Sequence, residues 1–255
     1  MKYRIIPAAC LLTFFANLNA QVGAGKVSYR RILNVDATSH KIDSIGTRAI
    51  LFFRPAQSLF IYNSEYTKRN DPAIKVTNEA DTYSFETIDK DGESIFTDYA
   101  RNEITIREFV WKKPYISGEP IPSITWTVEK DVRFFGKIIC HKATTSFRGR
   151  SYNAWFTYDI PFKLGPWKLQ GLPGLILEAS DSENEVQFKF ESIEIPSKEV
   201  ISFQPPTQGK RVNFSEFKEL WISETEKLYK FIQSTAEKGA AVDLKLNYYP
   251  IEKSY

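Results

Sequence analysis

Residues 165–178 read GPWKLQGLPGLILE, and this stretch determines how we expect the rest of the chain to be arranged. It is rich in glycine and proline, whereas the sequence on both sides is typical of β-strands. Leu172-Pro173-Gly174-Leu175 has the residue order of a type II turn, in which proline fixes φ at the second position and glycine supplies a positive φ at the third. A side chain at Gly174 would then cost about 1–2 kcal/mol. The apolar Leu175-Ile176-Leu177 predicts a strand buried on both faces, so we expect the turn to pack against the core.

The hexapeptide Gly171-Leu172-Pro173-Gly174-Leu175-Ile176 resembles the signature after which the GLPGLI family is named. This family comprises exported Bacteroidota proteins and is also described from Porphyromonas. The resemblance implies export and a β-rich domain, and it brings no agreed activity and no catalytic residues. Tyr249 departs from the family pattern, which usually has Asn before the proline that follows. Further segments similar to the family are Trp126, Gly136–Ala143, Phe147–Arg150, Ala154–Thr157, Ile160-Pro161 and Tyr249–Glu252.

Residues 1–20 predict a secretory signal peptide. Lys2 and Arg4 form a basic start, an apolar run follows, and Asn19-Ala20 precedes the expected cleavage site. A lipoprotein signal that uses Cys10 as the lipidated residue is the alternative, although its apolar segment of about six residues is shorter than the usual 7–15. We therefore expect an exported protein that is periplasmic, outer-membrane associated or extracellular. No later stretch approaches the ~18 apolar residues that a membrane-spanning helix needs.

Charge and cysteine content narrow the classes of partner and of fold. The chain has 34 Lys and Arg against 31 Asp and Glu, so removing Lys2 and Arg4 leaves 32 against 31 and a net charge near +1. This balance argues against a nucleic-acid partner, which normally requires a basic surface. Without Cys10, Cys140 is the only cysteine, so no internal disulfide can form and we expect Cys140 to be a small core residue. We expect residues 21–255 to form a single β-rich domain.

Alternating apolar residues at short intervals predict about ten strands. The clearest alternation runs over residues 152–160, and the turn before it is predicted at Arg148-Gly149-Arg150. Lys130-Asp131 predicts another turn. The long strand-like run from Phe134 to Phe147 contains Gly136, which predicts a bulge within the strand.

One helix is predicted, over residues 214–237. Asn213 can cap its first turn together with Glu216, and apolar residues recur at helical spacing from Phe214 to Ile232. A last strand is predicted over residues 244–248. The expected fold is mainly β: a strongly curved antiparallel sheet or open half-barrel of about ten strands, with one C-terminal amphipathic helix packed on it. This outline is similar to that of periplasmic carriers of lipids or lipoproteins.

The sequence offers little for catalysis, so we expect no catalytic residues, no metal and no cofactor. Cys140 and His141 are adjacent in a predicted strand and therefore point to opposite faces, which prevents a nucleophile–base pair. No set of Cys and His residues has the spacing of a transition-metal site. Glu183 and Glu185 flank Asn184 where a turn is expected, and a solvated turn explains both.

Four residues are candidates for ligand binding. Arg148 and Arg150 straddle a turn glycine and could hold an anion such as a carboxylate or phosphate, although ordinary surface charge also explains them. Trp155 lies with Thr157 on the strand face opposite the apolar one, where an exposed ring could stack on a sugar or line a groove. Trp167 is the aromatic candidate of the GPWKLQ segment. Aromatic residues are common in strands, so a place in the core or on the sheet surface is the alternative for Trp155.

We expect a non-catalytic binding or carrier module of the cell envelope, with a sheet that curves around an apolar cavity. Its partner would then be an apolar small molecule. The first alternative is a structural or accessory protein that docks on an outer-membrane transport or assembly machine through a sheet edge. The second alternative is an unrecognised hydrolase.

Overall fold

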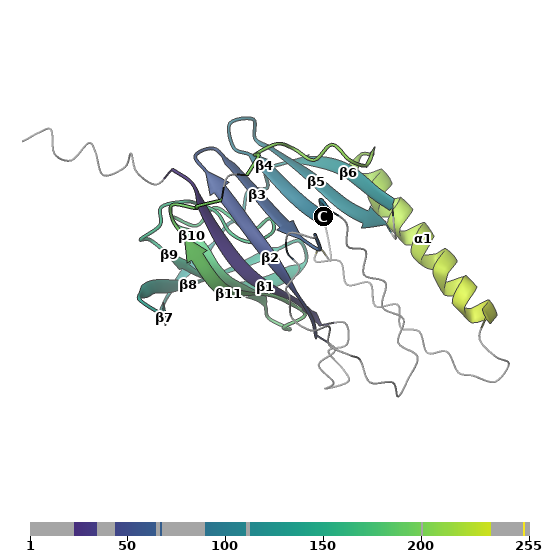
Figure 1. Cartoon of the computed structure of the whole chain (residues 1–255). Helices are drawn as coiled ribbons and strands as arrows, with labels where there is room; N and C mark the ends of the chain where they lie inside the picture. The colour runs from purple at the N-terminus through teal and green to yellow at the C-terminus, as the bar shows by residue number, and fades with distance from the viewer. Residues whose placement is uncertain are drawn as a thin grey trace, which may run out of the picture.

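The computed structural model describes residues 23–34, 44–64, 67, 90–110, 113–199, 201–235 and 252. The predicted signal peptide and the predicted strand over residues 244–248 lie outside these ranges. The described residues form one open sheet of 12 strands and one helix (Figure 1), which confirms the expected mainly β fold. The strand order is β12-β6-β5-β4-β3-β2-β1-β11-β10-β9-β8-β7. Neighbouring strands pair antiparallel except β12 and β6, which are parallel.

The elements follow the chain in a simple way, because most neighbours in the sheet are joined by short turns. Their bounds are β1 Gly25–Asn34, β2 Ser44–Arg54, β3 Gln57–Tyr62, β4 Glu93–Asp98, β5 Glu103–Val110, β6 Lys113–Pro120, β7 Thr127–Phe135, β8 Ile138–Phe147, β9 Arg150–Thr157, β10 Leu175–Asp181, β11 Val186–Glu194, β12 Lys210–Arg211 and α1 Phe214–Thr235.

The main core lies on one face of the sheet, which we call the core face. Alternate residues of the central strands point to it, because side chains of a strand alternate between faces. The buried side chains of the core face include Tyr29, Leu51, Phe60, Ile95 and Ile106. The intervening residues point to the opposite face, which we call the strap face, and there a smaller cluster is built from Ile50, Phe52, Leu59, Phe96 and Phe203.

The loop between β9 and β10, which contains the GLPGLI segment, packs on the core face. Leu164, Trp167, Leu169 and Leu172 are all buried in the main core. The loop is fixed at its end by Tyr29, whose hydroxyl donates a 2.7 Å hydrogen bond to the carbonyl of Ile176. The expectation that this segment packs against the core is thus correct, and the loop occupies space that the curved sheet would otherwise leave open.

The predicted type II turn at Leu172–Leu175 is wrong. Gly174 does not have a positive φ; the loop residues that do are Trp167, at 57°, and Gly171, at 95°. Gly174 is needed for a different reason: a Cβ built on it would lie 1.9 Å from the backbone oxygen of Thr157. The glycine lets the start of β10 approach the end of β9 more closely than any side chain would allow.

The prediction placed a bulge at Gly136 and a turn at Lys130-Asp131, and the structure shows the reverse. Gly136 has a φ of 62° and lies at the tip of the β7–β8 hairpin, so it forms the turn and not a bulge. The irregularity lies between Val128 and Val132, where Lys130-Asp131 was expected to turn the chain. The predicted turn at Arg148-Gly149 is correct, and both residues have positive φ as a two-residue hairpin turn requires.

The predicted helix is confirmed as α1, and so is its N-terminal cap. The backbone N–H of Glu216 donates to the side-chain oxygen of Asn213 at 2.8 Å, and the N–H of Asn213 donates to the Glu216 carboxylate at 2.9 Å. Phe217 of α1 is buried against Val110 and Tyr115, at the end of β5 and the start of β6. Within the described ranges, no helix is long and apolar enough to cross a lipid bilayer.

The close approach at Gly174 gives a testable stability difference. Gly174→Ala should lower the free energy of unfolding by about 3 kcal/mol, because the methyl group meets backbone that cannot rotate away. Gly136→Ala is the matched control: its φ is positive but the space around it is open, so about 1–2 kcal/mol is expected. Chemical denaturation measures both. A Gly174→Ala loss no larger than that of Gly136→Ala would contradict the packing described here.

Candidate binding groove

A segment without regular structure crosses the strap face between β11 and β12. We call its residues 201–208 the strap, and Figure 1 shows it running over the central strands towards β6. Phe203 anchors it, because this ring packs in the apolar cluster with Ile50, Phe52 and Leu59 and lies 4.6 Å from the guanidinium carbon of Arg54. This element was not predicted, because its prolines and polar residues are typical of an ordinary loop.

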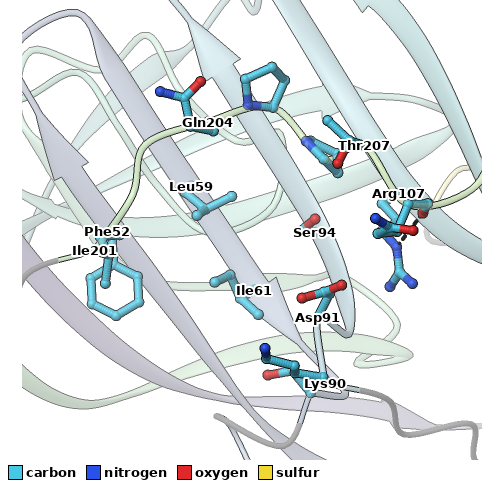
Figure 2. A pocket seen from close by; sticks show the side chains of 14 residues that line it. Phe52, Leu59, Ile61, Lys90, Asp91, Ser94, Arg107, Ile201, Gln204 and Thr207 are labelled. Carbon is cyan, nitrogen blue, oxygen red and sulfur yellow. Dashed lines mark hydrogen bonds between the residues drawn. The ribbon is translucent and has the colours of Figure 1, made fainter.

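A groove of about 340 Å³ lies between the strap and the sheet. Phe52, Leu59 and Ile61 form its apolar floor, and residues 204–208 form one wall. Lys90 and Asp91 lie at one end, as Figure 2 shows. This volume falls within the range of small-molecule sites, which are concave, mostly apolar and carry few polar groups.

Arg107 fastens the strap to the sheet beside the Lys90–Asp91 end of the groove. Its side chain is buried, its Nε donates a 2.7 Å hydrogen bond to the carbonyl of Gln208, and its Nη1 donates to the carbonyl of Gly92. The guanidinium carbon also lies 4.9 Å from the ring centre of Phe109. Because two backbone carbonyls accept these hydrogen bonds, the guanidinium holds the strap to the turn before β4.

Arg150, one of the expected anion-binding residues, is buried in an ion-paired cluster of this chain. Its Nη1 lies 2.6 Å from Asp181 and 2.5 Å from Glu185, and all three side chains are at most 8 % exposed. The expectation of a solvated turn is therefore wrong for Glu185, although Glu183 is exposed. The carboxylates of Asp181, Glu183 and Glu185 lie within 4.8 Å of one another, but the guanidinium already supplies the compensating positive charge.

Arg148, the second expected anion-binding residue, also holds carboxylates. Its Nη2 lies 2.6 Å from Glu119 of β6, and its Nε lies 4.0 Å from Glu252. Lys168 of the GLPGLI loop contacts the same two carboxylates. We call Glu119, Arg148, Lys168 and Glu252 the ionic quartet. It joins β6, near one edge of the open sheet, to the β8–β9 turn near the other edge.

The two candidate tryptophans differ in their exposure. Trp167 is buried, and its ring centre lies 5.7 Å from that of Phe147, so it belongs to the core. Trp155 is half-buried, with the guanidinium carbon of Arg133 at 5.8 Å from its ring. Thr157, expected on the same exposed face, is instead fully buried. Neither ring lines the groove, and the structure brings none of the four candidate residues to it.

Cys140 is free and fully buried, which confirms its expected role as a core residue. Burial raises the pKa of its thiol to about 12, so the group is a thiol and not a reactive thiolate at neutral pH.

Two carboxylates that were not predicted, Glu93 and Glu108, lie on the core face. Burial raises the pKa of Glu108 to about 7 and raises that of Glu93 as well. The cations Lys168 and Arg31 act in the opposite direction on Glu108, while Glu93 raises its pKa further. The hydroxyl of Tyr62 donates a 3.4 Å hydrogen bond to Glu108. Alternation could have placed Glu108 among inward-facing residues, but no sequence signal shows its charged neighbours.

Comparison with known proteins finds a partial match to a family of unknown function and a likeness in fold. Residues 148–178 match the model of Porph_ging, a protein of unknown function. This segment runs from Arg148 through the GLPGLI loop into β10. The match supports a relationship to a Porphyromonas-type family of unknown function, and it does not test the GLPGLI family name. No curated protein matches the sequence.

Two solved structures of PNGF-II are similar to this chain. The one in space group P21 has a TM-score of 0.55 and 13% sequence identity over 80% of this chain and 34% of PNGF-II. The one in space group C2 has a TM-score of 0.53 and 13% identity over 79% of this chain and 33% of PNGF-II. The chain therefore spans about a third of the length of PNGF-II, and the likeness concerns the fold alone.

We expect a large loss of stability when Arg150 is removed from its cluster with Asp181 and Glu185. Arg150→Met should cost about 3–5 kcal/mol, because Asp181 and Glu185 are left buried without a counter-charge. Arg133→Met is the matched control, since its half-exposed guanidinium pairs with Glu178 and should contribute at most about 1 kcal/mol. Urea unfolding of both variants measures the difference. Equal losses would show that burial does not determine the cost.

The raised pKa of Glu108 predicts a pH-dependent stability. Because its folded-state pKa of about 7 lies above the ordinary value of 4.5, its contribution is fully present below about pH 4.5 and is lost as the pH rises through 7. Glu108→Gln should therefore gain roughly 2–3 kcal/mol relative to the parent chain between pH 5 and pH 8. Glu103→Gln, at the exposed start of β5, is the control. If the two variants show the same pH profile, Glu108 does not titrate near neutrality.

Proposed function

We propose that this chain is a non-catalytic binding module of the bacterial cell envelope, and that its binding site is the groove beneath the strap. The observation that carries the proposal is the 340 Å³ groove with an apolar floor and a polar end. The expected cavity was on the inside of the curved sheet. The GLPGLI loop packs on that face, and the groove lies on the opposite one.

An apolar small molecule is the ligand that best fits this groove. Phe52, Leu59 and Ile61 offer it an apolar contact surface, and burying such surface is favourable by roughly 25 cal/mol per Å². Lys90 and Asp91 at the end of the groove suit a polar group on the same molecule. The predicted signal peptide supports a location outside the cytoplasm, where a carrier of apolar molecules is useful because water separates the membranes.

The groove supports binding better than hydrolysis. A hydrolase needs its titrating group in an accessible cleft. Glu108, whose pKa lies near neutrality, points to the core face beside Tyr62 and Lys168, whereas the groove is on the strap face.

The accessory role through a sheet edge is supported less well. A partner strand would need a regular, uncharged edge. Edge strand β7 carries Glu129-Lys130-Asp131 in its middle and is irregular there.

Filling the groove should abolish ligand binding without unfolding the protein. Ile61→Trp places a larger side chain in the partly exposed floor, and Ile222→Trp on the exposed side of α1 is the matched control. Native mass spectrometry of protein purified from its own envelope should show a bound small molecule in the parent chain and in Ile222→Trp, but not in Ile61→Trp. Absence of any co-purifying molecule from the parent chain, or equal occupancy in both variants, contradicts the proposal.

A further inference from the structure

The β7–β8 hairpin exposes an apolar surface that the fold does not use. Phe134 is 66% exposed, Val132 50%, Val128 45% and Ile139 43%. Phe134 lies directly opposite Ile139 in the ladder, so these two side chains share a face of the hairpin. Single exposed apolar residues are ordinary, but a group of them on one small element marks an interaction site.

The apolar surface extends beyond the hairpin through His141. Val132 pairs with His141 in the ladder, and the ring centre of His141 lies 5.0 Å from that of Tyr158, which is 49% exposed. We call Val128, Val132, Phe134, Ile139 and Tyr158 the hairpin patch. Tyrosine is enriched where an apolar phase meets water, because its ring prefers the first and its hydroxyl the second.

The hairpin that carries most of the patch has more basic than acidic residues, of which Arg133 pairs with Glu178 and Lys142 pairs with Glu129. Residues 127–147 contain Lys130, Arg133, Lys137 and Lys142 against Glu129 and Asp131, so four positive and two negative charges leave a net charge of +2. Lys137 is exposed and follows Gly136 in the turn. Gly136 is exposed as well, and a Cβ built on it would meet nothing within 4 Å, so the space beside the turn is open.

We propose that the β7–β8 hairpin docks the protein on a lipid bilayer surface that contains anionic headgroups. Phe134, Ile139 and Tyr158 enter the boundary between headgroups and acyl chains, while Lys137 and Lys130 face the phosphates. The proposal does not depend on the groove, because it concerns another part of the molecule.

A lipid surface fits the hairpin better than a second copy of the chain does. Antiparallel pairing of two β7 edges would need a regular strand, but the ladder is irregular between Val128 and Val132. The charged Lys130-Asp131 lies in that irregular stretch, and such features protect an edge from strand addition. Insertion into a headgroup layer needs no strand pairing, only exposed apolar side chains beside positive charge.

Co-sedimentation with lipid vesicles tests the proposal. The protein is purified in the form that accumulates in cells. Its first residue is determined for each variant, so that all variants compared begin at the same residue. Vesicles of phosphatidylcholine alone are compared with vesicles of phosphatidylcholine and phosphatidylglycerol. We expect the parent chain to bind the anionic vesicles, Phe134→Asp to bind at least about ten-fold more weakly, and Lys137→Glu to lose about five-fold or more on the anionic vesicles only.

Ile222→Asp on α1 is the matched control, since Ile222 is 46% exposed on another element, and it should bind like the parent chain. Ile139→Asp is a second variant of the patch and should behave like Phe134→Asp, and circular dichroism verifies that each variant is folded. The proposal is overturned if the parent chain binds neither kind of vesicle or if Ile222→Asp weakens binding as much as Phe134→Asp. It is also overturned if analytical ultracentrifugation shows a dimer that Phe134→Asp dissociates, because the patch would then belong to an interface between copies.

Discussion

The close backbone contact between Gly174 and Thr157 is the constraint on which the rest of this structure depends. It allows β10 to begin directly beside the end of β9, with the preceding loop folded onto the core face of the sheet. The loop then delivers Trp167 and Leu169 to the core and Lys168 to the ionic quartet. An open sheet has one face that must be covered, and here the chain covers it with its own glycine-rich loop.

The buried charges follow from the same arrangement. Lys168 can reach Glu119 and Glu252 only because the loop lies inside the curve of the sheet. Buried ion pairs contribute little net stability, but removing one partner is costly because the other remains desolvated. The quartet therefore fixes the relative position of β6 and the β8–β9 turn more than it strengthens the fold. On the core face, the side chains of the loop and the paired charges fill the space inside the curve of the sheet. The groove lies on the strap face instead.

The sequence predicts local structure well where a single segment carries the signal. Residues 213–216 contain both halves of a helix cap, and the alternation at Tyr152, Ala154 and Phe156 identifies β9, because both depend on neighbours along the chain. It fails where the cause is distant in sequence. Gly174 was assigned a positive φ because Pro-Gly is common in turns, whereas the reason for the glycine is a carbonyl on another strand. Arg150 and Glu185 are 35 residues apart, so their pairing requires the strand order, which composition does not contain.

The strap leads along the chain from the groove to the start of α1. Lys210 and Arg211 pair with β6 and the N–H of Val212 donates to the carbonyl of Ile116, so a short ladder lies between the groove and the start of α1 at Phe214. A molecule that lifted the strap would pull on this ladder and on the first turn of α1 together. The end of the strap and the first turns of the helix are thus held to the same strand, β6, so a displacement of one acts on the other.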